Sequence, residues 1–302
     1  MDVAAKKMKP KPEEYFSAEE YEWLQKVAAY ERDDPERFVF ADDGEVAEVC
    51  SNNADDIINE EDDWFFALRL GQDPDYVPKY ADSPEFGRVL VLGLRWCVDV
   101  WENVDAARWL GFLHQIGRFV EKDVQEAARL YRFCESKGDR QSMINLGYLY
   151  EYGHLGEPDY EASYKQFAKV MALGDFPEAI YKVGDAYSRA RVVERDLRTA
   201  YKLYKKCYDN CGDLIGVKAN AAFRLAELVI DPSNEEWDIP YDPVLALHYY
   251  QVAEIGLRIE VVNDSPWYAE RLEQAIAGQD RARSLMDEMG VDLAAKHRMF
   301  LP

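Results

Sequence analysis

Apolar side chains recur every three or four residues along much of this chain, which is the period of an α-helix with one buried face. The clearest stripe follows Asp196, and its apolar members are Leu197, Ala200, Tyr201, Tyr204 and Tyr208. These positions fall on one side of a helix with 3.6 residues per turn. We therefore expect a helix after Asp196 whose apolar stripe packs against neighbouring helices.

Capping signals place further helices along the chain. Ser17 and Glu20 have the spacing of a capping box and predict a helix over about residues 18–30. Pro84 follows a serine, as expected at the first position of a helix, and this helix should run to about Trp101. Periodic segments of this kind, without strand signals, predict an all-α protein.

Short sequence landmarks return at a nearly fixed interval. A Leu-Gly or Val-Gly pair recurs after 36 and then 37 residues, at Leu110-Gly111, Leu146-Gly147 and Val183-Gly184. Three other positions recur with the same offsets: Gly117, Gly153 and Ala190; Asp123, Asp159 and Asp196; Tyr131, Phe167 and Tyr204. A period of this length with helical spacing inside each unit predicts stacked antiparallel helix pairs, an α-solenoid.

Each unit can be divided into a first helix with the Gly pair, a loop, and a second helix that begins after an aspartate. Asp123 and Glu126 read as another capping box, and Asp242 followed by Pro243 reads as a further helix start. A glycine inside a helix costs about 1 kcal/mol relative to alanine. A glycine nevertheless recurs at the equivalent helix position of each unit. This indicates that the partner helix crosses closely there, at a distance that leaves no room for a Cβ.

These residues resemble the Sel1-like repeat family, a relative of the tetratricopeptide repeats. The match is clearest in the second unit, through Leu146-Gly147-Tyr148, Gly153, Asp159, Ala162, Phe167 and Gly174. The third unit departs at Val183 and Ala190. The resemblance implies adaptors that assemble proteins and share no catalytic residues.

The resemblance divides the chain into two parts. Residues 1–82 form an acidic helical segment, for which a capping role is one interpretation, and residues 83–302 form the Sel1-like solenoid. Within the solenoid we expect three good repeats, a degenerate fourth and a C-terminal cap, at 103–138, 139–174, 175–212, 213–256 and 257–302.

Charge is concentrated in one place. The net charge is −22, and residues 31–63 alone hold 14 acids against Arg32 and Arg37. Such a chain repels phosphate backbones, which argues against nucleic-acid binding and favours a basic protein partner. The start of the chain lacks the apolar stretch of a secretory signal, and no apolar run approaches the ~20 residues that span a bilayer, so we expect no membrane association.

The cysteine pattern favours the cytoplasm. Five cysteines (residues 50, 97, 134, 207 and 211) are an odd number without regular pairing, which suits a reducing compartment better than a disulfide framework. Cys207 and Cys211 lie four residues apart and could share a metal, but no further ligand is close in sequence, so buried thiols are the preferred interpretation. Recognisable nucleophile, metal or phosphate-loop motifs are missing from the sequence, so we expect neither a cofactor nor catalysis.

First helices line the concave face of such arrays, and the residue after each Gly pair should point toward a partner. This row and its neighbours are the candidate partner-binding residues: Phe112, Tyr148, Asp185, Glu227, Asn145, Lys182, Arg224 and Glu151. Aromatic and charged side chains presented together are typical of protein-binding surfaces. The alternative is that the aromatic members belong to the core.

A strip of basic residues lies opposite the tyrosine stripe. Its members are Arg195, Arg198, Lys202, Lys205 and Lys206. It could dock an acidic partner or the chain's own acidic residues 42–63, but charged faces on outer helices are usually only solvated, and we prefer that interpretation.

The leading hypothesis is a non-enzymatic scaffold that binds a protein or peptide on its concave face. The alternative is an acidic inhibitor or immunity-type protein that masks a basic toxin or nuclease, which the charge of residues 31–63 suggests.

Overall fold

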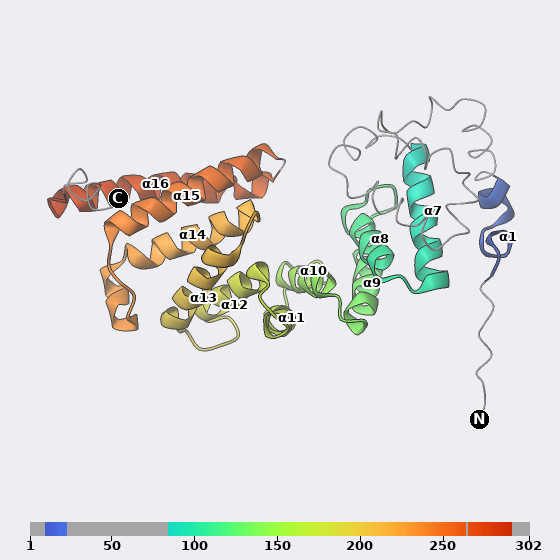
Figure 1. The fold of residues 1–302 in the computed structure, drawn as a ribbon, viewed down its shortest axis with the longest axis horizontal. Coiled ribbons are helices and arrows are strands. Elements are labelled where there is room, and N and C mark those ends of the chain that lie inside the picture. The colour runs from blue at the N-terminus through green and yellow to red at the C-terminus, as the bar shows by residue number, and fades with distance from the viewer. Residues whose placement is uncertain (1–9, 23–83, 264, 292–302) are drawn as a thin grey trace. The chain divides into compact units, whose positions relative to one another are not determined.

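The computed structural model describes residues 10–22, 84–263 and 265–291 of the 302-residue chain. These ranges are built from helices and contain no strand (Figure 1), so the predicted all-α helical-repeat fold is confirmed. The principal helices are α1 (Pro12–Tyr15), α7 (Pro84–Trp101), α8 (Val104–Ile116), α9 (Val124–Ser136), α10 (Arg140–Glu151), α11 (Tyr160–Ala172), α12 (Pro177–Arg189), α13 (Leu197–Asn210), α14 (Ile215–Val229), α15 (Pro243–Val262) and α16 (Ala269–Glu288), with 3₁₀-helices η2 (Pro232–Trp237) and η3 (Pro266–Tyr268). Of the helices in these ranges, none combines the length and the apolar character needed to cross a membrane.

The helices form two compact units. The first contains the described residues up to 149 together with 154–156, and the second contains 150–153 and the described residues from 157 onward. The boundary therefore lies inside the predicted second repeat. Helices α8 to α15 cover residues 104–262, and the predicted division of this region into repeats stays a prediction. The boundary at residue 82 and the acidic residues 31–63 lie outside the described ranges.

In the first unit, the segment 10–22 covers one side of α7. Phe16 is buried, and its ring stacks on Trp96 at a centroid separation of 5.8 Å. Tyr15 meets the same indole edge-on and donates a hydrogen bond to Asp99 Oδ2 at 2.5 Å. The segment is therefore tied to α7 by both apolar and polar contacts.

Helix starts follow the predicted capping chemistry in all but one detail. Ser17 and Glu20 exchange both bonds of a capping box, at 3.0 and 3.2 Å. The Asp123 carboxylate accepts a hydrogen bond from the Glu126 amide at 2.9 Å. The prediction of a reciprocal bond, from the Asp123 amide to the Glu126 carboxylate, is wrong. The Asp123 amide donates instead to the His114 carbonyl at 2.9 Å. The Glu126 carboxylate accepts two charge-assisted hydrogen bonds from Arg129, one turn further along the helix.

The Gly pairs make room for a tyrosine ring of the second helix. A Cβ added to Gly111 would lie 2.8 Å from Tyr131 Cε1, and one added to Gly184 would lie 2.9 Å from Tyr204 Cε1. The two repeats therefore use the same contact, glycine beneath tyrosine. This explains why the sequence retains a poor helix former at that phase.

The loop after each first helix begins with a left-handed residue. Gly117 has φ 75° and Gly153 has φ 67°, but the equivalent third-repeat position is Ala190, with φ 52° and ψ 39°. The left-handed conformation brings Cβ close to the backbone carbonyl and costs a non-glycine residue about 1 kcal/mol. The backbone of Ala190 is therefore locally strained.

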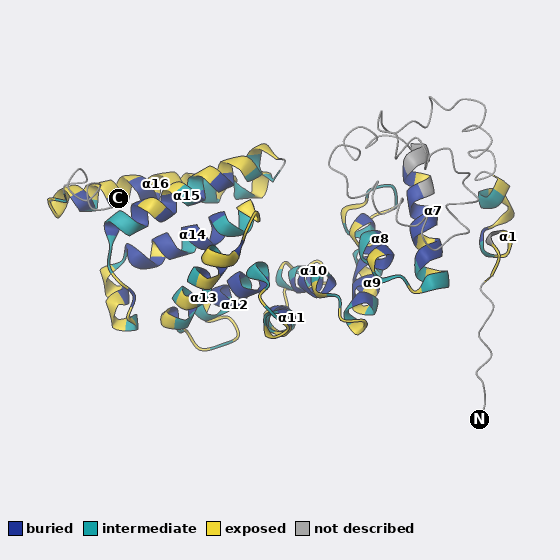
Figure 2. Ribbon diagram, viewed as in Figure 1, coloured by how far each residue is buried: buried dark blue, intermediate teal, exposed yellow. Residues whose placement is uncertain are grey.

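The second unit has two layers. Consecutive helices from α11 to α16 pack against each other, and in addition α12 contacts α14 and α14 contacts α16, so the first helices lie side by side. Figure 2 shows α14, the middle one of these three helices, coloured as buried along most of its length. The stripe predicted after Asp196 is confirmed, because Leu197, Ala200 and Tyr204 are buried in the core of this unit.

The C-terminal helices are longer than expected. Helix α15 continues to Val262, beyond the predicted repeat end at residue 256, and α16 runs unbroken through Gly278. Gly278 packs beneath the Tyr250 ring, where a Cβ would come within 2.4 Å. Gly278 is therefore a packing position inside the helix.

Candidate partner-binding site

Asp185 is the centre of a polar network on the first-helix layer of the second unit. It follows Gly184 on α12 and is only 6% exposed. Tyr204 donates to its Oδ1 at 2.7 Å, and Arg224 Nε contacts the same oxygen at 3.2 Å. Arg189, one turn along α12, approaches Oδ2 at 3.4 Å. One carboxylate thus connects α12, α13 and α14.

Burial alone would raise the pKa of Asp185, but Arg224, Arg189 and the Tyr204 hydrogen bond outweigh it and hold the pKa below its ordinary value. Burial and the neighbouring Asp185 raise the pKa of Tyr204, which therefore keeps its proton and remains a donor. The Asp185 carboxylate is therefore ionised at neutral pH, and Arg224 and Arg189 compensate its charge.

The network extends along the layer to α16. Arg224 also contacts Glu227 Oε2 at 2.8 Å. Arg271 of α16 donates to Asn220 of α14 and lies 3.4 Å from the Tyr181 hydroxyl of α12. Polar contacts therefore join three successive first helices.

A second ion pair lies beside this hub. Lys182 Nζ is 2.7 Å from Glu151 Oε2, and its side chain is only 8% exposed. Burial opposes the lysine charge, but Glu151 outweighs it, so the pKa of Lys182 lies above its ordinary value. Arg191 reaches the other Glu151 oxygen at 3.8 Å and lies over the Tyr160 ring at 4.4 Å.

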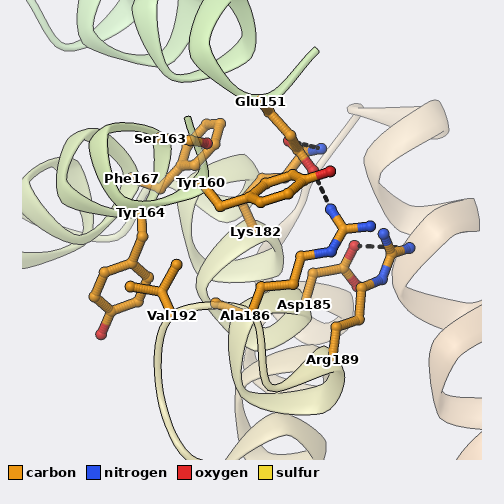
Figure 3. Close-up of a pocket in the computed structure, with 11 residues that line it drawn as sticks. Glu151, Tyr160, Ser163, Tyr164, Phe167, Lys182, Asp185, Ala186, Arg189 and Val192 are labelled. Carbon is orange, nitrogen blue, oxygen red and sulfur yellow. Dashed lines mark hydrogen bonds and ion pairs between the residues drawn. The ribbon is translucent and has the colours of Figure 1, made fainter. Parts of the chain in front are cut away.

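These groups surround a small pocket. Figure 3 shows Glu151, Tyr160 and Arg189 arranged around it, with Phe167 and Tyr164 contributed by α11. The pocket offers about 30 Å³, room for about two water-sized groups. It opens beside a wider surface depression that is lined by the start of α11, by Arg191 and Val192 of the loop before α13, and by the acidic residues Glu157, Asp159 and Glu161.

The predicted partner-binding residues divide between the two units. Five meet in the network of the second unit: Glu151, Lys182, Asp185, Arg224 and Glu227. Of these, Glu227 is 44% exposed at its side chain, whereas Asp185 is buried, so the row does not point uniformly outward.

The other three, Phe112, Asn145 and Tyr148, lie in the first unit. Phe112 is 39% exposed and meets Trp109 edge-on at 5.7 Å, while Asn145 and Tyr148 are half-buried. The alternative interpretation, that the aromatic residues of this row belong to the core, is therefore wrong for Phe112. Whether any of the eight binds a partner stays a prediction.

Sequence reasoning missed two arginines and the far end of the network. Arg189 follows Asp185 by four residues, a spacing that favours ion pairs on a helix and could have identified it. Arg191 and Arg271 carry no such local signal, because their partners come from other helices.

Four members of the basic strip, Arg198, Lys202, Lys205 and Lys206, lie on α13, whereas Arg195 precedes the helix because its N-cap is Asp196. Arg198 pairs with Asp238 at 2.6 Å, Lys205 with Asp209 at 2.5 Å and Lys206 with Asp175 at 2.5 Å. Exposed pairs of this kind contribute little to stability. They agree with a solvated face, and a docking role for the strip stays a prediction.

The cysteines in the described ranges are buried free thiols, namely Cys97, Cys134, Cys207 and Cys211. Burial raises the pKa of Cys207 to about 12, so this thiol is protonated at neutral pH.

The fold and the repeated glycine–tyrosine contact define a helical-repeat protein of the two-helix class. Four segments match the Sel1 repeat, at residues 104–133, 140–165, 177–209 and 219–253. The chain thus contains four Sel1 repeats, as its sequence landmarks predict. The fourth match contains Leu225-Ala226 in place of the Gly pair.

Two curated relatives from Arabidopsis thaliana share part of this chain. They are the ERAD-associated E3 ubiquitin-protein ligase component HRD3B, 37% identical over 60 residues, and HRD3A, 34% identical over 77 residues. The matches cover 20% and 23% of this chain but only 10% and 11% of the relatives.

Two crystal structures of similar proteins also align. A Sel1 repeat protein from Oxalobacter formigenes is 16% identical with a TM-score of 0.48, over 74% of this chain and 97% of its own. A protective antigen present in uropathogenic Escherichia coli strains is 18% identical with a TM-score of 0.44, over 74% of this chain and 53% of its own.

Proposed function

We propose that this chain is a non-enzymatic scaffold that binds a protein or peptide partner on the first helices of its Sel1 repeats. The supporting observation is that exposed anchor-type side chains lie on these helices, Phe112 on α8 and Glu227 on α14. Exposed aromatic groups next to polar side chains are typical of binding hot spots.

The names of the two Arabidopsis relatives also support a role in protein assembly. HRD3A and HRD3B are components of a ubiquitin ligase, that is, parts of an assembly. We propose that this chain likewise supplies a protein-binding surface to a larger assembly. The match covers about a tenth of either relative, so the identity of that assembly is not carried over. The cytoplasmic location, and the lack of nucleic-acid or membrane partners, remain part of the proposal.

Affinity purification with matched variants tests this role. The double variant Phe112→Ser with Glu227→Lys changes two exposed first-helix residues, and Lys202→Glu changes an exposed residue of a second helix. A specific partner should be recovered at least about tenfold less with the double variant, in line with the loss of a hot spot, and equally well with the control. Equal recovery by all three proteins would contradict the assignment of the first helices.

The alternative of an inhibitor that masks a basic protein depends on residues 31–63, which lie outside the described ranges. Deleting these residues separates the two functions. The scaffold hypothesis expects unchanged partner recovery, whereas the inhibitor hypothesis expects a large loss that deepens with salt.

A further inference from the structure

The polar network of the second unit carries more cations than carboxylates. Its cations are Lys182, Arg189, Arg191, Arg224 and Arg271, and its carboxylates are Glu151, Asp185 and Glu227. This local excess lies in a chain whose net charge is −22. An uncompensated positive group near a pocket is the arrangement that receives an anionic group from a partner.

At the pocket itself, three cations stand against two carboxylates: the lining contains Lys182, Arg189 and Arg191 together with Glu151 and Asp185. Arg189 contacts Asp185 at 3.4 Å and Arg191 contacts Glu151 at 3.8 Å, both longer than a close charge-assisted hydrogen bond. Their side chains are 32% and 35% exposed. A guanidinium has five N–H donors, and each of these two makes a single long ion pair among the described residues, so both retain donors for another acceptor.

Lys165, a neighbouring cation, forms a shorter ion pair than either arginine. Lys165 of α11 lies in the same depression and contacts Glu161 at 2.6 Å. Its charge is already compensated at close range. The two arginines therefore differ from Lys165 in the quality of their ion pairs and not in the sign of their charge.

The end of α12 and the loop that follows it hold the two arginines at the rim of the pocket, Arg189 in the last turn of the helix and Arg191 in the loop. Ala190, between them, adopts the left-handed conformation that its equivalents reach as glycine. Strained residues of this kind persist where the surrounding structure holds them, and they are concentrated at binding sites. Arg191 is further fixed by stacking on Tyr160. The rim is thus organised before any partner arrives, which lowers the entropic cost of binding.

The size and lining of the pocket suit a carboxylate. A volume of about 30 Å³ accepts two oxygen-sized groups, and a carboxylate has two oxygens that match the guanidinium fork. Tyr164 and Val192 line both the pocket and the depression beside it, and they provide an apolar wall for the next side chain.

We propose that Arg189 and Arg191 receive an Asp or Glu side chain of the bound protein or peptide, with a large apolar residue beside it against Tyr164 and Val192. This inference rests on the proposed function and names the chemistry of its partner. We assign a polypeptide partner because the net charge of the chain opposes the extended phosphate backbone of a nucleic acid. A single carboxylate, in contrast, interacts mainly with charges within about 8 Å, because salt screens the more distant acidic residues.

Selection from a random dodecapeptide library displayed on phage tests the proposal, with the full chain as bait. Wild type should enrich peptides with Asp or Glu next to a large apolar residue. The double variant Arg189→Ala with Arg191→Ala should bind these peptides at least about tenfold more weakly, because charge-assisted hydrogen bonds are lost. Lys165→Ala removes a compensated charge from the same depression and should bind as wild type does. Thermal melting of each protein verifies that the variants fold.

Three results would overturn the proposal. If enriched peptides lack acids, or bind the arginine double variant equally well, the proposed function stands and this site fails. If wild type enriches no peptide and retains no protein partner, both fail. If wild type sediments as a dimer that dissociates in the arginine double variant, a second copy of the chain occupies the rim instead.

Discussion

Asp185 illustrates how a residue that sequence places on a binding surface is used for structure. Taking a carboxylate out of water is costly, and only well-placed partners recover that cost. Asp185 has three, from α12, α13 and α14. Its sequence position after Gly184 correctly locates it on the first-helix layer, but its partners are 19 and 39 residues away, at Tyr204 and Arg224. Such distances leave no local pattern from which burial could be predicted.

Removing this carboxylate should destabilise the protein. We expect Asp185→Ala to lower the free energy of unfolding by about 3 kcal/mol, because it leaves Arg224 and Arg189 without their buried partner. Urea denaturation followed by circular dichroism measures this. Glu227→Ala, which removes a half-exposed carboxylate from the same network, should cost less than about 1 kcal/mol. Equal effects of the two variants would argue against Asp185 as the centre of the network.

The same group predicts how stability depends on pH. The folded-state pKa of Asp185 is lowered, so its contribution is fully present above the unfolded-state pKa of about 3.9 and is lost as the pH falls through the folded value. The stability difference between wild type and Asp185→Asn should therefore be constant near neutral pH and shrink below about pH 4. Denaturation curves of both proteins at several pH values measure it. A difference that grows toward acid would contradict the assigned direction.

Ala190 offers a stabilising change. Ala190→Gly relieves the left-handed conformation and should raise the free energy of unfolding by a few tenths to about 1 kcal/mol, after the entropy of the unfolded glycine is subtracted. Ala186→Gly, four residues earlier in the helical part of α12, makes the same chemical change where it should cost about 1 kcal/mol. Denaturation midpoints of the two variants should therefore shift in opposite directions. Shifts in the same direction would contradict the strain at Ala190.

At the scale of elements, helix boundaries follow local chemistry closely. Asp123, Asp159, Asp196 and Asp242 each accept an amide hydrogen bond at the start of a second helix, as their recurrence predicts. The capping-box rule fails at Glu126, because the Glu126 carboxylate binds Arg129 and the Asp123 amide binds the His114 carbonyl. The sequence predicts that a partner helix approaches closely at each Gly pair. The structure adds that the group in contact at Gly111 and Gly184 is a tyrosine ring of the second helix.

This contact can be tested between helices α12 and α13. Gly184→Ala places a methyl group 2.9 Å from Tyr204 Cε1, so we expect a loss of about 1–3 kcal/mol in spite of the better helix propensity of alanine. Gly216→Ala is the matched control on α14, because its Cβ meets only the mobile end of the Glu260 side chain. Thermal melts should show a lower midpoint for the first variant and an unchanged or higher one for the second. A stabilising Gly184→Ala would exclude the tyrosine contact as the reason for that glycine.

At the scale of the whole molecule, local and total charge point to different partners. The acidic total suggests a basic partner, whereas the first-helix network of the second unit has a cationic excess at its rim. Interactions between exposed charges are screened beyond about 8 Å at physiological ionic strength, so the groups at the contact should decide recognition, and the total charge should affect mainly the rate of encounter. The class of fold could be predicted from the sequence because the same weak local signal recurs in each repeat.

The arginines at the rim of the pocket could not be predicted in the same way, since Arg191 and Glu151 are distant in sequence and meet only in the folded chain.

Hydrogen–deuterium exchange on the chain alone and with a recovered partner tests the central claim most directly. Binding on the first-helix layer should slow exchange in α8, α12 and α14 and in the loop that carries Arg191, while α9, α13 and α15 change little. Protection confined to the second helices, or to residues 31–63, would contradict the account.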